Sequence, residues 1–285
     1  MRKTEIQAPA KINLFLEVLP QKTDNNLHPI ETIIEKVTLF DLISLIVTPG
    51  RMEIACNLPE LARTSNLAWK AAQLLKERYR IREGVHIQIK KKIPLAAGLG
   101  GGSSDAAAVL LGLNKLWKIE EEPKNLTKIA FRLGSDVPAF LAPGRCLVSG
   151  CGEKVRPLSS KPELNYLLVL TGIRVKTKEA YRWIDNLTYQ PYSSKIMVAG
   201  LKKGGTRTIG ERLFNRFQEV LRKRERKIKI WEERLKGTFS YSLMTGSGGA
   251  FFVLLDRRPD TDREFEYQKG KLVPVRTFRR QHGDY

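Results

Sequence analysis

The chain has 285 residues, of which 42% are hydrophobic, and this composition excludes a disordered chain and suits one large or two modest domains. Its 50 Lys and Arg residues against 30 Asp and Glu residues give a net charge of +20, which predicts affinity for anions without choosing among nucleotides, nucleic acid and acidic metabolites. The 3 cysteines form no C-x-x-C pair, so a disulfide framework is not expected.

Neither a targeting segment nor a membrane span is expected. The first five residues lack the apolar core of a signal peptide, and no apolar run approaches the roughly 20 residues needed to cross a bilayer. The 3 histidines lie far apart and show no metal-ligand spacing. These observations predict a cytoplasmic protein that does not associate with membranes.

The first predicted strand covers residues 5–19, in which polar and apolar residues alternate from Lys11 onwards. Lys11 and Asn13 lie two residues apart, so they share one face of this strand. That face either points into a site or lies on the wet side of an edge strand, and this segment alone does not decide between them. A further extended segment at 27–34 and two strand-like runs at 36–40 and 42–47 follow.

A helix is predicted at 67–79, capped by one of the polar residues at 64–66. A basic strand at 85–92 then leads into the loop 93–105, in which four glycines occupy five positions. Exposed backbone N–H groups in such a loop can approach an anion closely, and Ser103 or Ser104 could cap the helix that follows. The loop is therefore interpreted as a phosphate cradle, since a merely flexible loop rarely lies between a clear strand and a clear helix.

This cradle is neither a Walker A element nor a dinucleotide fingerprint. No lysine follows the last glycine, and in G-x-G-x-x-G the final glycine would fall on Ser103. After a helix at 126–133, Asp136 lies in a turn, where it is either a turn former or a functional carboxylate.

The second half of the chain is predicted to begin after a strand pair at 146–155 and a linker at 159–162. A buried strand at 164–170, a helix starting at 177 and an exposed loop at 201–208 follow. A long charged helix is predicted at 215–236; its basic cluster at 222–227 is interpreted as a solvated face because no nucleic-acid signature accompanies it. A second glycine-rich turn at 245–249 precedes a last strand at 272–278 and a polar end.

Three of these segments, 9–13, 98–104 and 245–249, occur in the order of the three motifs of the GHMP kinases, and the chain resembles this family of small-molecule ATP kinases. The resemblance implies an α+β fold of two domains. Residues 1–160 would form a unit like domain 2 of ribosomal protein S5, and residues 161–285 a ferredoxin-like unit, with ATP and substrate in the cleft between them.

The resemblance also implies roles for individual residues. Asp136 would accept or orient the proton of the attacking hydroxyl, and Lys11 would keep Asp136 ionised and stabilise the developing charge. ATP and Mg²⁺ are the implied cofactors, with Ser103 or Ser104 near the metal and the other metal ligands left open. The implied nucleotide-binding residues are Pro94, Ala96, Gly98, Leu99, Gly100, Gly101, Gly102, Ser103 and Ser104.

The segments around His28, Asp136 and Tyr181 narrow the resemblance to members that phosphorylate the 2-hydroxyl of a cytidine diphosphate conjugate of methylerythritol, in non-mevalonate isoprenoid synthesis. The implied substrate-binding residues are Asn13, His28, Tyr181, Thr245 and Gly246. Leu27 stands where these members usually have tyrosine, which removes one aromatic face for the cytosine.

Two alternatives remain open at this point. The first is another GHMP kinase that acts on mevalonate, homoserine or a sugar. The second is a non-catalytic nucleic-acid-binding protein, which the net charge favours and the combination of Lys11, Asp136 and two glycine loops opposes. The sequence predicts a monomer or a homodimer without choosing between them.

Overall fold

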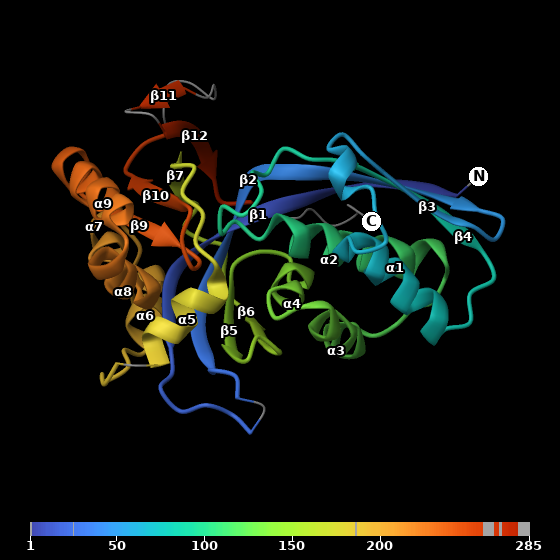
Figure 1. Cartoon of the computed structure of the whole chain (residues 1–285), viewed down its shortest axis with the longest axis horizontal. Coiled ribbons are helices and arrows are strands. Elements are labelled where there is room, and N and C mark those ends of the chain that lie inside the picture. Colours follow the sequence, from blue (N-terminus) through green and yellow to red (C-terminus); the bar gives the residue numbers. More distant parts are fainter. Residues whose placement is uncertain (1, 25, 186, 259–264, 268–269, 279–285) are drawn as a thin grey trace.

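Two sheets organise the computed structural model, which describes residues 2–24, 26–185, 187–258, 265–267 and 270–278 (Figure 1). The strands are β1 (Lys3–Val18), β2 (Ile30–Thr48), β3 (Met52–Cys56), β4 (Gly84–Lys90), β5 (Cys146–Gly150), β6 (Lys154–Pro157), β7 (Asn165–Leu170), β8 (Phe214–Asn215), β9 (Ser242–Thr245), β10 (Ala250–Leu255), β11 (Phe265–Tyr267) and β12 (Gly270–Arg276). The helices are η1 (Pro59–Leu61), α1 (Leu67–Arg78), α2 (Gly101–Leu116), α3 (Pro123–Leu133), α4 (Val137–Leu141), α5 (Thr177–Asp185), α6 (Lys195–Lys203), α7 (Thr206–Gly210), α8 (Arg216–Arg224) and α9 (Arg226–Thr238). The predicted polar end, 279–285, lies outside the described residues.

The first sheet has the strand order β3-β4-β2-β1-β8, and β5 and β6 extend it beside β2. The predicted runs at 36–40 and 42–47 belong to one continuous strand, β2, which is 19 residues long. Asp41, between the two runs, is fully buried and does not interrupt the strand, because its carboxylate accepts hydrogen bonds from the N–H groups of Lys92 and Ile93.

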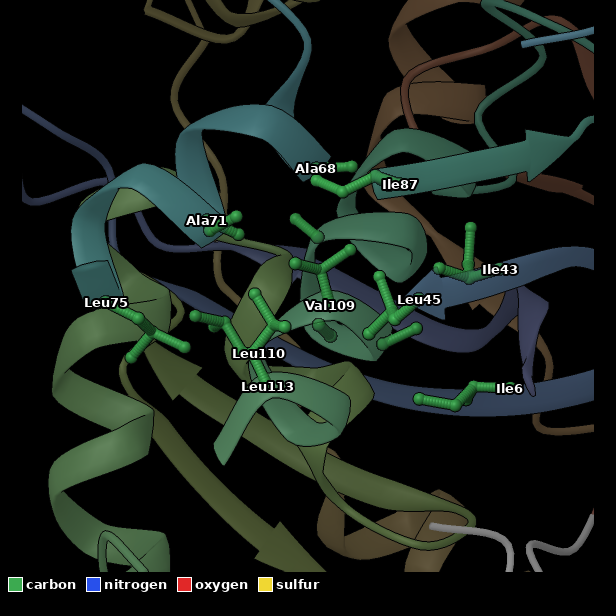
Figure 2. Packing of buried hydrophobic residues seen from close by; sticks show 14 of the residues in the cluster. Ile6, Ile43, Leu45, Ala68, Ala71, Leu75, Ile87, Val109, Leu110 and Leu113 are labelled. Carbon is green, nitrogen blue, oxygen red and sulfur yellow. The ribbon is translucent and has the colours of Figure 1, made fainter. Parts of the chain in front are cut away.

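Helices α1 and α2 cover the first sheet, and Figure 2 shows the hydrophobic core between these helices and the sheet. The sheet contributes Ile6, Ile43, Leu45 and Ile87, and the helices contribute Ala68, Ala71, Leu75, Val109, Leu110 and Leu113. A Cβ at Gly112 would lie 2.5 Å from Leu45 Cδ1 and 2.7 Å from Ile6 Cδ1, so glycine is what lets α2 lie this close to the sheet. The predicted cap of α1 is confirmed at Asn66, whose side chain accepts from Ala68 N at 2.9 Å.

The second sheet has the order β11-β12-β7-β10-β9, and α8 and α9 pack against it. The prediction of one helix over 215–236 is wrong, because the chain breaks at Glu225, which is extended (φ −112°, ψ 98°). A continuous helix would place Arg222 one turn from Arg226 and Lys223 one turn from Lys227, and like charges at that spacing are destabilising.

The prediction of an exposed loop at 201–208 is also wrong. Residues 201–203 end α6 and residues 206–208 begin α7, and Leu201 is 5% exposed. Met197, Leu201 and Ile209 pack into the same core, so burial of apolar surface outweighs the loop-like composition. Gly204 and Gly205, with φ of 77° and 82°, form only the connection between the two helices.

The chain has a mixed α+β fold of two domains, one built on each sheet. The predicted boundary at 160/161 falls between β6 and β7 and stays a prediction. Buried Arg145 pairs with Glu35 and donates to the carbonyls of Ser159 at 2.9 Å and Pro162 at 3.1 Å, which holds this connection to the first sheet. Of the helices described, none has the length and apolarity needed to span a bilayer.

Candidate active site

The glycine-rich loop connects β4 to α2, as predicted, but the helix begins earlier than its serines suggest. Gly100 occupies the N-cap position in the left-handed region (φ 72°), and α2 starts at Gly101. The prediction that Ser103 or Ser104 caps the helix is therefore wrong, because glycine adopts this backbone without strain and moves both serines into the first turn. The hydroxyl of Ser104 is buried and makes no hydrogen bond within the described residues.

The first turn of α2 can hold an anion. The first N–H groups of a helix have no acceptor within the helix and carry partial positive charge. The space beside Gly102 is open, since the nearest atom to a Cβ added there is Leu67 Cδ1 at 3.9 Å. The backbone of Gly102 is thus available to a phosphate, and this fits the nucleotide that the sequence predicts.

A buried ion cluster fixes the base of this loop. Lys91 Nζ lies 2.8 Å from Asp105 Oδ2 and also pairs with Asp41. Asp41 accepts from Lys92 N at 2.5 Å and from Ile93 N at 2.8 Å, so one carboxylate anchors the start of the loop. Burial raises the pKa of Asp105 to about 7, and the ammonium of Lys91 opposes that rise.

The three predicted motifs meet through their backbones. Lys11 N donates to Leu99 O at 2.9 Å, which joins β1 to the glycine loop. A Cβ at Gly98 would lie 2.8 Å from Thr245 O, and a Cβ at Gly246 would lie 3.0 Å from Gly98 O. The two glycine turns therefore approach each other more closely than any other residue type would allow.

Asn13 connects the side chains of the same motifs. Its Oδ1 accepts from Lys11 Nζ at 2.7 Å, Thr245 Oγ1 at 3.1 Å and Gly246 N at 2.9 Å, and its Nδ2 donates to Thr32 Oγ1 at 2.9 Å. Lys11, Asn13 and Thr245 are all buried. The substrate contacts predicted for Asn13, Thr245 and Gly246 stay predictions, and the structure gives these residues internal hydrogen bonds.

Lys11 and Asp136 are electrostatic neighbours. Burial lowers the pKa of Lys11 from its ordinary value, and the negative charge of Asp136 partly opposes this shift. Asp136 immediately precedes α4 and lines a cavity of about 640 Å³ together with Ser103, His28 and Tyr181. One cavity thus joins the predicted catalytic carboxylate, the end of the phosphate loop and the predicted cytidine-binding residues.

At the far end of this cavity, both ring nitrogens of His28 face oxygen acceptors. Nδ1 lies 2.8 Å from Leu19 O and Nε2 lies 2.6 Å from Asp185 Oδ1. Lys22 Nζ is also 2.7 Å from Asp185 Oδ1. Lys22 and Asp185 were missed in the sequence, although Asp185 follows Tyr181 by four positions and so lies on the same face of α5.

The rings of His28 and Tyr181 stack directly on each other, with centroids 5.9 Å apart and planes at 16°. A base between two rings needs roughly 7 Å, twice the separation of touching carbon atoms, so cytosine does not fit between these rings as they stand. Phe217, which also escaped prediction, packs edge-on against Tyr181 at 5.0 Å. Leu27 is 50% exposed and lines the same cavity.

The predicted nucleotide-binding residues do not all present side chains to the cavity. Leu99 is 1% exposed and packs in the core, so only its backbone is available at this site. Among the described residues, no group of three or more His, Cys, Asp and Glu residues could hold a metal ion.

Comparison with known proteins agrees with this geometry. Residues 66–144, which include the glycine loop and Asp136, match the model "GHMP kinases N terminal domain". The 4-diphosphocytidyl-2-C-methyl-D-erythritol kinase of Clostridium botulinum is 33% identical over 276 residues, covering 95% of this chain and 98% of that protein. The enzyme of the same name from Geobacillus thermodenitrificans is 35% identical over 289 residues, covering 98% of this chain and 99% of that protein.

Solved structures give the same result. A crystal structure of 4-(cytidine 5'-diphospho)-2C-methyl-D-erythritol kinase superposes with a TM-score of 0.76 at 31% identity, covering 95% of this chain and 99% of that one. A mevalonate kinase from L. major shares the fold with a TM-score of 0.67 at 16% identity, covering 98% of this chain and 96% of that one. With the three motifs in contact and relatives matched along almost their whole length, the chain belongs to the 4-diphosphocytidyl-2-C-methyl-D-erythritol kinases of the GHMP kinase family.

Proposed function

We propose that this protein transfers the γ-phosphoryl group of ATP to the 2-hydroxyl of 4-diphosphocytidyl-2-C-methyl-D-erythritol, a step of the non-mevalonate isoprenoid pathway. The observation that carries the proposal is the single cavity of about 640 Å³ that Asp136, Ser103, His28 and Tyr181 line together. A cavity with a carboxylate between a phosphate loop and an aromatic subsite suits a substrate that carries both a hydroxyl and a base.

Catalysis in phosphoryl transfer consists mainly of positioning and charge stabilisation. Asp136 would orient the substrate hydroxyl and accept its proton as the oxygen attacks the γ-phosphorus. Lys11, held by Asn13 at 2.7 Å, would stabilise the charge that develops on the transferring phosphoryl oxygens. The backbone N–H groups at the start of α2, including that of Gly102, would hold the remaining phosphates of the nucleotide.

Mg²⁺ is the second proposed cofactor, and it would neutralise charge on the β- and γ-phosphates. The buried hydroxyl of Ser104, which has no partner among the described residues, fits a ligand at the metal or at the phosphates. Ser103, on the cavity side of the same turn, is the other candidate. Few protein ligands are needed, because Mg²⁺ commonly keeps several waters and takes substrate phosphates as ligands.

The substrate subsite is proposed to comprise His28, Tyr181 and Leu27, with Asn13, Thr245 and Gly246 shaping the end near the reacting hydroxyl. Since the His28 and Tyr181 rings are 5.9 Å apart, cytosine would stack on one exposed ring face or would separate the rings on binding. We also propose a cytoplasmic location. The choice between monomer and homodimer stays a prediction.

A coupled ATP-consumption assay with purified protein tests the function. We expect Mg²⁺-dependent turnover with 4-diphosphocytidyl-2-C-methyl-D-erythritol and none with mevalonate, homoserine or galactose. Turnover with one of the other alcohols alone would assign the chain a different substrate. Absence of ATP turnover together with salt-sensitive binding of RNA would instead favour a nucleic-acid-binding protein.

A further inference from the structure

A second cavity lies beside α4, the short helix that follows the catalytic aspartate. Its volume is about 940 Å³, and it opens between α3, α4 and the β5–β6 hairpin. Most of its walls are apolar, including Leu126, Phe131, Leu141 and Val155. A cavity of this size and character is within the range of ligand-binding sites. Among the described residues, none lines both this cavity and the substrate cavity.

Three lysines surround this apolar space. Lys124 and Lys128 lie one helical turn apart on α3, and Lys154 begins β6. All three are exposed, and within the described parts of the chain none of them forms a salt bridge. The positive charge at the cavity is thus free to meet a ligand.

Two carboxylates also line this cavity, and each accepts hydrogen bonds from neighbouring residues. Glu121 accepts hydrogen bonds from the Tyr79 hydroxyl and from the Asn125 amide at 2.9 Å, and these bonds lower the pKa of its carboxyl. Glu153 accepts from Cys151 N at 2.7 Å. These hydrogen bonds come from neutral donors and leave both carboxylates negative, so the three lysines exceed them by one positive charge at the cavity.

We propose that this second cavity binds an amphipathic anion, a molecule with a phosphate or carboxylate head and an apolar chain. The head would lie among Lys124, Lys128 and Lys154, and the chain would extend over Phe131 and Leu141. Burying each methylene of such a chain contributes about fourfold in affinity, so a chain of several carbons binds far more tightly than its head group alone.

Helix α4 connects this cavity to the catalytic site. Leu141 at its end lines the second cavity, while Asp136 precedes its first residue and lines the substrate cavity. Between them, the ring of Phe140 packs against the nucleotide loop, since a Cβ at Gly100 would lie 2.8 Å from Phe140 Cζ. A ligand that displaces α4 therefore moves Asp136 and the loop together, and it would lower kcat without occupying either substrate site.

Isothermal titration calorimetry with the full chain tests the binding. Decyl phosphate, used below its micelle-forming concentration and with a non-hydrolysable ATP analogue present, is expected to bind once per chain. Its Kd should be at least about tenfold lower than those of decanol and inorganic phosphate. Decanoate in a parallel titration identifies which head group is preferred. Equal binding of decanol, or binding of many molecules per chain, would overturn the proposal.

Two variants locate the site. Lys124→Gln with Lys128→Gln should raise the Kd of decyl phosphate about tenfold, and Thr127→Trp should fill the cavity and remove binding. The matched control, Lys70→Gln with Lys115→Gln, changes exposed lysines of α1 and α2 and should leave the Kd unchanged. An unchanged Kd in both cavity variants would overturn the site. A dimer that Thr127→Trp dissociates would assign the cavity to a second copy of the chain instead.

Steady-state kinetics test the connection through α4. Saturating decyl phosphate should lower kcat and leave both KM values unchanged, and Thr127→Trp should no longer respond to it. Competition with ATP would place the phosphate in the nucleotide loop and contradict the proposal. An unchanged kcat at saturation would contradict the coupling through α4.

Discussion

The phosphoryl-transfer end and the cytidine end of the substrate cleft differ in how firmly their residues are held. At the first end, Asn13 is 2% exposed and its side-chain amide makes hydrogen bonds to residues of β1, β2 and the second glycine turn. At the second end, Leu27 is 50% exposed on the segment between β1 and β2. The reaction centre is preorganised, whereas the recognition end is adjustable only at the exposed Leu27, because His28 and Tyr181 beside it are held by hydrogen bonds and ring contacts. The following variants test this difference.

Asp136→Asn carries the largest expected loss. An amide keeps the shape of the side chain but cannot accept the proton, so kcat should fall by about 10²–10⁴ while ATP binding is retained. Single-turnover kinetics and nucleotide titration separate these two effects. The control Asp24→Asn changes an exposed loop carboxylate and should remain fully active. Near-normal turnover of Asp136→Asn would remove this carboxylate from the chemistry.

Lys11→Ala should lower kcat by about 10²–10³, because one charge-stabilising donor is lost, with a much smaller change in the KM for ATP. Lys3→Ala, at the exposed start of the same strand, is the matched control. A change confined to KM would show that Lys11 only anchors the nucleotide.

Asn13→Leu tests how rigid the buried end is. Removing the amide leaves several buried donors without their acceptor, so we expect a loss of about 3 kcal/mol in the free energy of unfolding. Thr245→Val removes one of the side chains that donate to Asn13, and it should lower the free energy of unfolding by less than half as much. Denaturant titration measures both losses. Equally small losses for the two variants would contradict the view that Asn13 is the centre of these hydrogen bonds.

The pH dependence of kcat reports on Lys11. Burial lowers its pKa below the ordinary value of 10.5, so the ammonium loses its proton at a lower pH than an exposed lysine does. We expect kcat to fall on the alkaline side with an apparent pKa below 10.5. Lys11→Met should lack this alkaline limb. An unchanged limb in that variant would assign it to another group.

Leu27→Tyr gives the smallest expected effect and tests the adjustable end. A new aromatic face should lower the KM for the cytidine substrate by about fivefold or more, since stacking on a base contributes roughly 1–3 kcal/mol. Ile196→Tyr, at a position 54% exposed, is the control for adding a surface tyrosine. An unchanged KM would show that residue 27 does not contact the base.

The glycine-rich motifs predicted their own local structure well, because glycine is needed where the backbone turns tightly. The strand, glycine loop and helix around Gly98–Gly102 appear where expected, and the second glycine turn lies between β9 and β10. The cap of α2 was assigned to the wrong residue because a left-handed Gly100 starts the helix before either serine. The preference of serine for helix N-caps identifies the cap only when the backbone conformation of the preceding residues is known.

Tertiary contacts account for the features that the sequence could not predict. Repulsion between the basic residues disfavours a continuous helix, but the position of the break at Glu225 depends on how α8 and α9 both pack on the second sheet. The helical state of 201–208 depends on the core that Leu201 enters. Likewise, the position of Asp185 beside His28 joins residues 157 positions apart. No periodicity or local motif encodes such a distance.

The short strand β8 bears on whether the two halves of the chain can fold as separate polypeptides. Phe214 and Asn215 come from the second half of the chain, yet they pair with Phe15 and Leu16 of β1 and complete the first sheet. A fragment that stops at residue 160 would leave this edge of β1 uncovered and prone to aggregation. Co-expression of the two halves as separate polypeptides should therefore recover soluble protein better than expression of either half alone.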